Sequence, residues 1–248
     1  MIKYSKEDIR KEMTSLRNDL TKEYVNYLSQ KIISTLLKLP IFKDSQNIML
    51  YLSFGNEVDT FRLIEVCKEQ GKKIIVPFCV KEGRQIVPTE IKNVEEDLVR
   101  TKFGYLQPKK ELVRPVNTQE IDLILLPGLA FDRGCYRVSY GGGYYDRFLG
   151  KLNFTVPTIG LIYDFQLIDL APIENHDIPV DYVITEKRII IRTDERVSFK
   201  EDFMENQGIK NNEEKKIQKN ICEECGSTMK PDSGCFICPN CGYSPCDI

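Results

Sequence analysis

The stretch from residue 121 to residue 148, IDLILLPGLAFDRGCYRVSYGGGYYDRF, constrains the fold of this chain more than any other. It opens with a short apolar run, residues 121–126, which Pro127 and Gly128 bring to an end. A run of this length with a Pro-Gly ending favours a buried strand over a helix. The sequence therefore predicts a buried strand that leads directly into a glycine-rich segment.

Other apolar runs predict the rest of the sheet. The further candidate strands are residues 47–52, 73–79, 85–88, 158–163, 182–185 and 189–192. Helical spacing of apolar residues outside these runs predicts covering helices. One of them should begin at a cap on Thr21 and run up to Pro40. We therefore expect an α/β fold, a mostly parallel open sheet flanked by helices in a Rossmann-like three-layer arrangement, with its ligand at the carboxyl ends of the strands.

Three consecutive glycines stand at residues 141–143. Glycine has no Cβ, so it allows a positive φ and a close approach by a ligand. A glycine turn between a strand and a helix directs backbone N–H groups at a phosphate. Arg137 and Arg147 would add positive charge, and Asp146 would hold the magnesium that accompanies a nucleotide. Three glycines alone are equally typical of a plain flexible turn.

The longer string, LPGLAFDRGCYRVSYGGGYYDR at residues 126–147, resembles the signature of the 5-formyltetrahydrofolate cyclo-ligases, also called 5,10-methenyltetrahydrofolate synthetases. The family pattern is roughly PG-x-AFD-x-x-G-x-RLGYGGGYYDR. This chain departs from it with Val138 for the usual Leu and Ser139 for the usual Gly. If position 139 requires a positive φ, a serine strains it by about 1 kcal/mol or more. The resemblance covers roughly residues 3–192.

The resemblance implies an ATP-dependent ring closure of 5-formyltetrahydrofolate to 5,10-methenyltetrahydrofolate, with release of ADP and phosphate. In the family mechanism the formyl oxygen attacks the γ-phosphate, N10 then attacks the formyl carbon, and phosphate leaves. ATP is needed because phosphate is a far better leaving group than hydroxide. The tasks of the protein are alignment and charge neutralisation.

The resemblance also implies roles for particular residues. The expected ATP-binding residues are Lys6, Arg10, Arg137, Val138, Ser139, Tyr140, Gly141, Gly142, Gly143, Tyr144 and Tyr145. The expected folate contacts are Leu52, Glu57, Phe103 and Tyr144. Arg137 and Asp146 are the expected catalytic pair, and Asp146 and Asp177 the expected Mg²⁺ ligands.

The residues themselves leave alternatives to two of these roles. Ser5, with Asp8 three residues on, predicts a helix start with a variant capping box. Lys6 and Arg10 then lie on one face of that helix, where a solvated basic face is the alternative to phosphate binding. Glu57 follows a predicted strand end, where open α/β sheets bind ligands, although a surface loop acid is the alternative.

The segment ENHDIPVD, residues 174–181, holds the only histidine of the chain. A lone loop histidine such as His176 is more often structural than catalytic. Asp177 is the favoured magnesium ligand. Asp181 is the competing acid, although it leads directly into a predicted strand.

Residues 195–220 lose apolar content and gain charge, which predicts a polar linker between a catalytic domain, residues 1–194, and a tail, residues 221–248. The tail holds two C-x-x-C pairs that are 12 residues apart. Such pairs present four thiolates to a structural Zn²⁺ at about 2.3 Å. The expected ligands are Cys222, Cys225, Cys238 and Cys241, with Cys235 and Cys246 as alternatives for one position. A zinc ribbon of this kind can bind a protein partner, and the sequence does not identify that partner.

Composition narrows the class of protein. The net charge of −2 gives no basic field that would attract nucleic acid. No apolar run reaches the roughly 18 residues of a membrane span, and the charged N-terminus is not a signal peptide. We therefore expect a cytoplasmic protein without a membrane partner. Two alternatives to the cyclo-ligase remain: a related nucleotide-dependent enzyme with another small substrate, and a degenerate domain that serves as a zinc-ribbon binding protein.

Overall fold

The computed structural model describes residues 4–192, 230–232 and 235–237. The chain divides into two compact units, Met1–Met204 and Glu205–Ile248, and each is described by itself. The predicted linker at residues 195–220 and the four predicted zinc ligands lie outside the described residues. In the second unit, β13 (Lys230–Asp232) and β14 (Cys235–Ile237) form an antiparallel pair between the two C-x-x-C pairs of the sequence.

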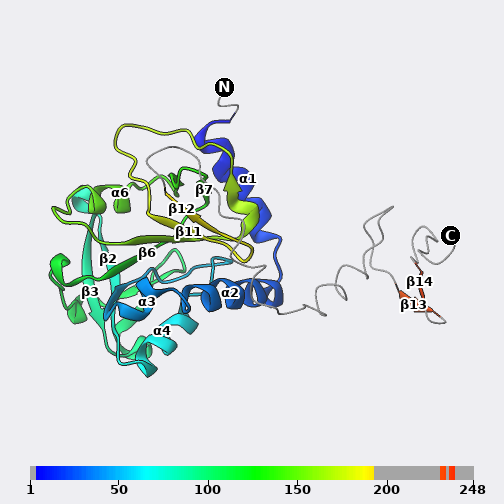
Figure 1. The fold of residues 1–248 in the computed structure, drawn as a ribbon. Helices are drawn as coiled ribbons and strands as arrows, with labels where there is room; N and C mark the ends of the chain where they lie inside the picture. The colour runs from blue at the N-terminus through cyan, green and yellow to red at the C-terminus, as the bar shows by residue number, and fades with distance from the viewer. Residues whose placement is uncertain (1–3, 193–229, 233–234, 238–248) are drawn as a thin grey trace. The chain divides into compact units, whose positions relative to one another are not determined.

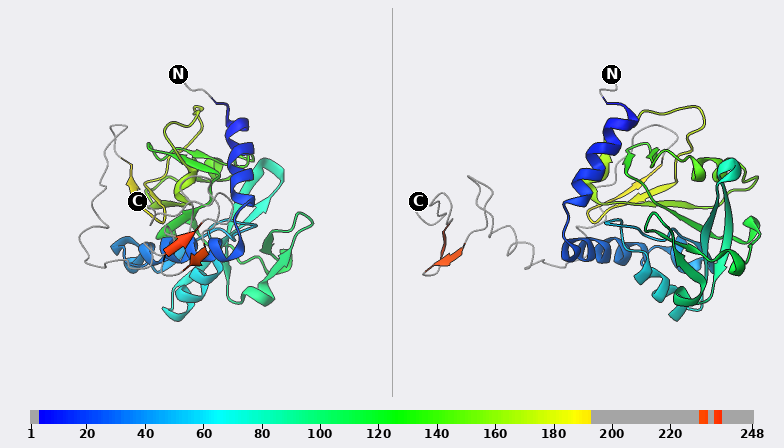
Figure 2. Two further views of the ribbon diagram at one scale, coloured as in Figure 1. Left: turned by 90° about the vertical axis from the view of Figure 1, so that its right-hand side faces the viewer. Right: turned by 180° about the vertical axis from the view of Figure 1, so that it is seen from behind.

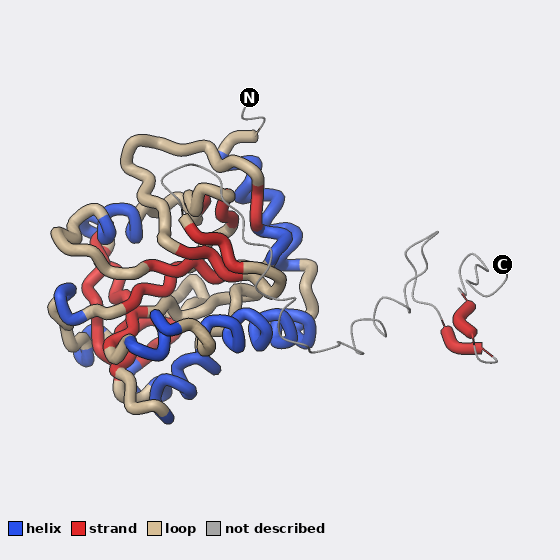
Figure 3. Tube along the Cα trace, viewed as in Figure 1, coloured by secondary structure: helices blue, strands red, loops and turns tan. Residues whose placement is uncertain are grey.

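A seven-stranded sheet with the order β12-β11-β9-β6-β1-β2-β3 forms the centre of the first unit (Figures 1 and 3). Its strands are β1 (Asn47–Met49), β2 (Lys73–Val80), β3 (Gln85–Ile91), β6 (Leu123–Leu126), β9 (Thr158–Leu161), β11 (Tyr182–Ile184) and β12 (Ile189–Ile191). The pairings of β2 with β3 and of β11 with β12 are antiparallel, and the four between them are parallel. The predicted mostly parallel sheet is confirmed.

Helices cover both faces of this sheet, as the expected three-layer arrangement requires. They are α1 (Lys6–Asn18), α2 (Lys22–Leu36), α3 (Pro40–Asp44), α4 (Phe61–Glu69), α5 (Val94–Asp97) and α6 (Tyr144–Leu149), with short 3₁₀ turns η1 (Glu82–Arg84), η2 (Lys110–Leu112), η3 (Thr118–Glu120) and η4 (Asp164–Gln166). Figures 1 and 2 show α2, α3 and α4 on one face, and α6 on the other. No helix of the described residues is long and apolar enough to cross a membrane. The cytoplasmic location stays a prediction.

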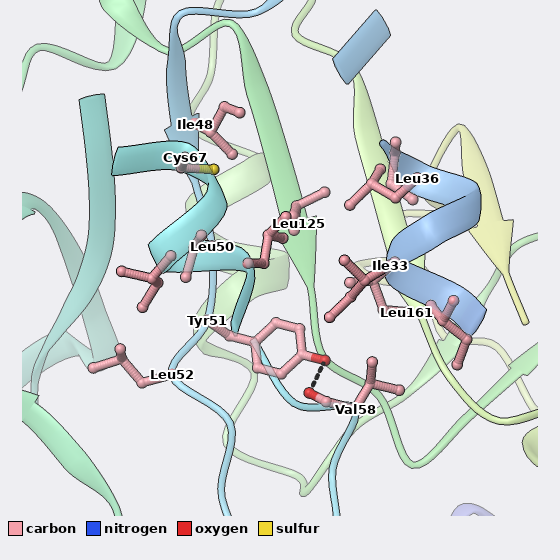
Figure 4. Packing of buried hydrophobic residues seen from close by; sticks show 14 of the residues in the cluster. Ile33, Leu36, Ile48, Leu50, Tyr51, Leu52, Val58, Cys67, Leu125 and Leu161 are labelled. Carbon is pink, nitrogen blue, oxygen red and sulfur yellow. Dashed lines mark hydrogen bonds between the residues drawn. The ribbon is translucent and has the colours of Figure 1, made fainter. Parts of the chain in front are cut away.

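The strands of the sheet centre are apolar on both faces because helices cover both. On β6, Leu123 and Leu125 pack in the cluster beneath α2 and α4, whereas Ile124 and Leu126 pack on the face of α6. All four side chains are fully buried. Figure 4 shows the first cluster, in which Cys67 of α4 lies among strand side chains. This two-sided burial explains why the strand reads as a continuous apolar run.

The first two helices begin at the predicted caps, but the second ends earlier than predicted. Ser5 and Asp8 form the predicted capping box of α1, and the side chain of Thr21 caps α2. We expected the second helix to run on to Pro40, and this is wrong. The helix ends at Leu36, and Pro40 opens α3 instead, a first-turn position that needs no N–H donor.

Small sheets beside the main one were not predicted from the sequence. One has the order β10-β7-β8 and is built from β7 (Ala130–Asp132), β8 (Arg137–Val138) and β10 (Leu167–Ile168). The other is a hairpin of β4 (Leu98–Arg100) and β5 (Leu106–Pro108). The three-stranded sheet packs against α1, so it brings that helix to the segment before the glycines.

Candidate active site

The strand order creates a switch point between β1 and β6. From β1 the chain continues outward to β2, and from β6 it continues in the other direction to β9 and β11. Loops that leave two neighbouring parallel strands in opposite directions open a crevice at their carboxyl ends, where such sheets bind ligands. The segment with Glu57 follows β1, and the segment with the glycines follows β6. The two predicted ligand-binding segments therefore start from adjacent strands.

Two of the three glycines adopt backbone conformations that favour glycine. Gly141 has φ +91°, and Gly143, which caps α6, has φ +64°. A Cβ on Gly142 would lie 2.8 Å from the ring of Tyr144. Ser139 is not among the residues with positive φ, so the strain that its Cβ would have caused is absent. The departure from the family pattern at this position therefore carries no backbone cost.

Three cationic side chains on one face of α1 reach residues of other loops. Lys6 Nζ lies 2.6 Å from Asp177 Oδ2, Arg10 Nε donates to the carbonyl of Ser139 at 2.7 Å, and the third is Arg17. The side chain of Lys6 is only 15% exposed. Burial lowers the pKa of Lys6, but its hydrogen bonds and ion pairs with Asp177 and Glu174 outweigh this and raise it. This face of the helix is therefore not a solvated basic surface.

Glu57 is buried beneath these loops rather than exposed as a surface acid. Its Oε1 accepts from the hydroxyl of Tyr140 at 2.8 Å, and its Oε2 from the backbone N–H of Phe54 at 2.9 Å. Arg17 Nη1 lies 3.7 Å from Oε1. Burial raises the pKa of Glu57, and the charge of Arg17 opposes that rise. Burial also raises the pKa of Tyr140 to about 12.

Arg137 and Asp146, the predicted catalytic pair, form a buried ion pair. Arg137 Nη2 lies 3.1 Å from both carboxylate oxygens, and the two side chains are 2% and 9% exposed. The guanidinium lies over the ring of Tyr145, 5.3 Å from its centroid. Arg137 Nε and the Tyr145 hydroxyl are both buried, and neither has a hydrogen-bond partner among the described residues. A buried donor without a partner is costly, so these two groups are available to a ligand.

The two predicted magnesium carboxylates each have a cationic partner. Asp146 accepts from Arg137, and Asp177 from Lys6. Within the part of the chain that the structure describes, no group of three or more His, Cys, Asp or Glu could hold a metal ion. Magnesium binds through one or two carboxylates plus phosphate oxygens and waters, so a pair of separate carboxylates beside a basic glycine loop still fits.

The competing acid, Asp181, is occupied elsewhere. Its Oδ2 accepts from the backbone N–H and the hydroxyl of Thr158, and its Oδ1 pairs with Arg192 at 3.0 Å. These bonds join the start of β9 and the residue after β12 to the residue before β11. His176 is 67% exposed in side-chain area and lies 3.8 Å from Glu174, which agrees with a structural or solvent-facing role.

The predicted folate contact Phe103 is an exposed aromatic on the loop between β4 and β5. It is 61% exposed and stacks on Tyr105, with a centroid distance of 6.4 Å. Phe54 meets Tyr105 edge to face at 6.4 Å. Leu52, another predicted contact, is 9% exposed at the end of the segment after β1. The sequence places Tyr105 beside Phe103 in this loop, but Phe54 was missed as a member of the aromatic group.

The sequence interpretation named Arg147 beside the glycine loop but missed Arg84 and Arg17. Arg84 Nη1 donates to the carbonyl of Gly142 at 3.4 Å, and Arg147 Nη1 donates to the carbonyls of Gly142 and Gly143 at 3.1 and 3.0 Å. Arg17 was missed although its signal was present. It follows Arg10 by seven residues, which places both on one face of a helix.

The parallel strands at the centre of the open sheet and the basic glycine loop at its switch point define the class: an open α/β protein, of the kind whose ligand sites lie at the carboxyl ends of the strands. The model of the 5-formyltetrahydrofolate cyclo-ligase family matches residues 2–186. This chain belongs to that family.

Individual relatives agree. A probable 5-formyltetrahydrofolate cyclo-ligase of Caenorhabditis elegans is 30% identical over 199 residues, 77% of this chain and 97% of the relative. The 5-formyltetrahydrofolate cyclo-ligase of Escherichia coli K12 is 26% identical over 70% of this chain and 96% of its own. The solved structure of Aquifex aeolicus 5,10-methenyltetrahydrofolate synthetase is similar with a TM-score of 0.66 and 33% identity, over 80% of this chain and 98% of that one.

Proposed function

We propose that this chain catalyses the ATP- and Mg²⁺-dependent closure of 5-formyltetrahydrofolate to 5,10-methenyltetrahydrofolate, with release of ADP and phosphate. The observation that carries the proposal is the bond from Arg10 to the carbonyl of Ser139, directly before the glycines. It brings the basic face of α1 against the glycine loop, and a loop so lined fits a triphosphate. Family membership supports the same reaction.

The side chains of the site have separable tasks in this reaction. Lys6, Arg10 and Arg137 would neutralise the triphosphate, and the backbone N–H groups of residues 140–145 would bind its oxygens. Glu57 would orient the folate, whose formyl oxygen attacks the γ-phosphate. No covalent nucleophile is required, because the reaction needs only alignment and charge neutralisation.

Asp146 and Asp177 are the residues that would hold Mg²⁺. The metal supplies charge neutralisation at the phosphate oxygens when it is bound. Arg137 contacts Asp146 through both carboxylate oxygens, so this arginine would orient the carboxylate that holds the metal.

The test is turnover of 5-formyltetrahydrofolate with Mg-ATP, followed through the absorbance of the methenyl product. We expect the wild-type chain to form product only when both ATP and Mg²⁺ are present. We expect Asp146→Ala to lose at least about a hundredfold in kcat/KM, the size of a strong charged interaction. Absence of product from the wild-type chain, together with turnover of another small substrate, would overturn the proposal.

We further propose that residues 1–194 form the catalytic domain, residues 195–220 a linker and residues 221–248 a structural zinc ribbon. The spacing of the C-x-x-C pairs supports the zinc site, and the β13–β14 pair between them is compatible with a ribbon. The expected ligands are Cys222, Cys225, Cys238 and Cys241. Metal analysis should give about one zinc per chain. A Cys222→Ser/Cys225→Ser variant should retain none of it.

A further inference from the structure

Arg17 in the last turn of α1 connects two segments that follow different strands. It is 4% exposed. Its Nη2 donates to the hydroxyl of Tyr140, and its Nη1 lies 3.7 Å from Glu57 Oε1. Its Nε is buried and has no hydrogen-bond partner within the part of the chain that the structure describes. The structure thus places a fully charged side chain between a residue of the glycine loop and the carboxylate that faces the folate in the proposed reaction.

We propose that Arg17 is a positioning residue: it fixes Glu57 as an ionised acceptor and Tyr140 as its oriented hydrogen-bond donor, so that Glu57 can bind N–H groups of the folate pteridine ring. This inference rests on the proposed function, because it assigns Glu57 to the folate. It deepens that function by naming a residue that acts on substrate binding through another side chain.

The direction of the hydrogen bonds supports this arrangement. A phenol has a single proton, so a Tyr140 hydroxyl that accepts from Arg17 directs its own proton to Glu57 Oε1. The second oxygen, Oε2, is held by the backbone N–H of Phe54. Asn56 donates from its side chain to the backbone carbonyl of Arg17 at 2.8 Å, which ties the same loop to the end of α1. Each partner of Glu57 is therefore held by a second contact.

Charge provides the second argument. A buried carboxylate readily takes up a proton unless a cation lies beside it. Burial raises the pKa of Glu57, and Arg17 is the cation that lowers it. The other titratable groups that face Glu57 are phenols with pKa values raised by burial: Tyr51, Tyr140, Tyr145 and Tyr163. Phenols of this kind are neutral near pH 7, so in the described part of the chain Arg17 supplies the charge that keeps Glu57 ionised.

The kinetic test compares Arg17→Met, which removes the charge but keeps the apolar stem, with Arg17→Lys, which keeps the charge. We expect Arg17→Met to raise KM for 5-formyltetrahydrofolate about tenfold at pH 7. In this variant KM should fall again as the pH is raised, because Glu57 without its cation ionises only at higher pH. The KM for Mg-ATP should change less than about threefold, and Arg17→Lys should restore most of the affinity. Equal and pH-independent losses for both substrates would overturn the proposal.

Glu57→Gln supplies the matched background. A glutamine cannot ionise, so adding Arg17→Met to Glu57→Gln should cost less than about threefold in KM for 5-formyltetrahydrofolate. A full tenfold loss in this background would mean that Arg17 does not act through Glu57. If Arg17→Met does not fold, Tyr140→Phe tests the same link: it should raise that KM, and an unchanged KM would contradict the proposal.

A readout without substrate separates this inference from the proposed function. In the full chain carrying ¹³C-labelled glutamate, the Glu57 carboxyl resonance is identified by its loss in Glu57→Gln. We expect it to titrate at higher pH in Arg17→Met than in the wild-type chain. If the wild-type chain does not turn over 5-formyltetrahydrofolate, the proposed function fails, and this titration still decides whether Arg17 sets the charge of Glu57. An unchanged titration in Arg17→Met would overturn the inference even in an active enzyme.

Discussion

Lys6 Nζ lies 2.6 Å from Asp177 Oδ2, so a side chain proposed to bind phosphate is paired with a side chain proposed to bind magnesium. Glu174 Oε1 lies 3.0 Å from the same ammonium group. The hydrogen bonds and charges of the two acids raise the pKa of Lys6 although burial lowers it, so the ammonium group is paired with both acids. A triphosphate that uses Lys6 must therefore compete with two carboxylates.

The competition leads to a prediction for Glu174, whose side chain is 60% exposed. Glu174→Gln removes one competitor, and we expect KM for Mg-ATP to fall by about two- to threefold, the modest effect of an exposed ion pair. Glu7→Gln is the matched control, because Glu7 also pairs with a lysine of α1, Lys11, at 2.9 Å. Steady-state kinetics at low salt would contradict the prediction if both variants changed KM equally.

The Arg137–Asp146 pair should separate stability from catalysis. Removing one partner of a buried ion pair leaves an uncompensated charge, so Asp146→Asn should lower the free energy of unfolding by about 3–5 kcal/mol. The double variant Arg137→Met/Asp146→Leu should regain most of this stability in urea unfolding but none of the turnover. Turnover in the double variant would show that the pair is structural only.

The glycine loop can be tested with two glycines of similar backbone conformation. Gly143 has φ +64° and Gly71 has φ +69°, so alanine at either position should cost about 1–2 kcal/mol of stability. At Gly71 the added Cβ meets nothing within 4 Å, whereas at Gly143 it would lie 2.5 Å from Arg147 Nη1. We expect only Gly143→Ala to raise KM for Mg-ATP. An equal rise in Gly71→Ala would point to a general loss of stability instead.

Much of the fold was predictable because the relevant signals are local. The apolar run at β6, the capping box of Ser5 and the helix start after Gly143 all depend on neighbouring residues. The three-stranded sheet was not predictable, because β8 and β10 have two residues each and form only through their partners. The role of Arg17 was hidden for the same reason. Its partners Glu57 and Tyr140 lie 40 and 123 residues further along the chain and meet it only in the folded protein.

Ser139 shows how a sequence comparison can mislead about strain. The serine replaces a glycine of the family pattern, but its backbone is outside the positive φ region, and Arg10 binds its carbonyl rather than its side chain. We therefore expect Ser139→Gly to leave turnover unchanged and to lower stability by up to about 1 kcal/mol, because glycine loses more chain entropy on folding. A gain in stability by thermal unfolding would contradict the structure at this position.

Asp97 stabilises the hairpin that carries Phe103, and it should make the free energy of unfolding depend on pH in the acid range. Its carboxylate pairs with Arg114 Nη1 at 2.7 Å and accepts from the backbone N–H of Lys92 at 2.7 Å. The hydrogen bond from Arg114 is the main cause that holds the pKa of Asp97 well below its usual 3.8. A group with a lowered pKa in the folded chain stabilises it above the unfolded value and loses that contribution as pH falls.

Asp97→Asn should therefore be less stable than the wild-type chain by about 2 kcal/mol at pH 7, and the difference should shrink as pH falls below about 3.8. Urea unfolding at several values between pH 7 and pH 3 measures this difference directly. Glu111→Gln, at an exposed acid of η2, is the control and should match the wild-type chain throughout. A difference between Asp97→Asn and the wild-type chain that stays constant down to pH 3 would mean that the ion pair with Arg114 does not contribute through its charge.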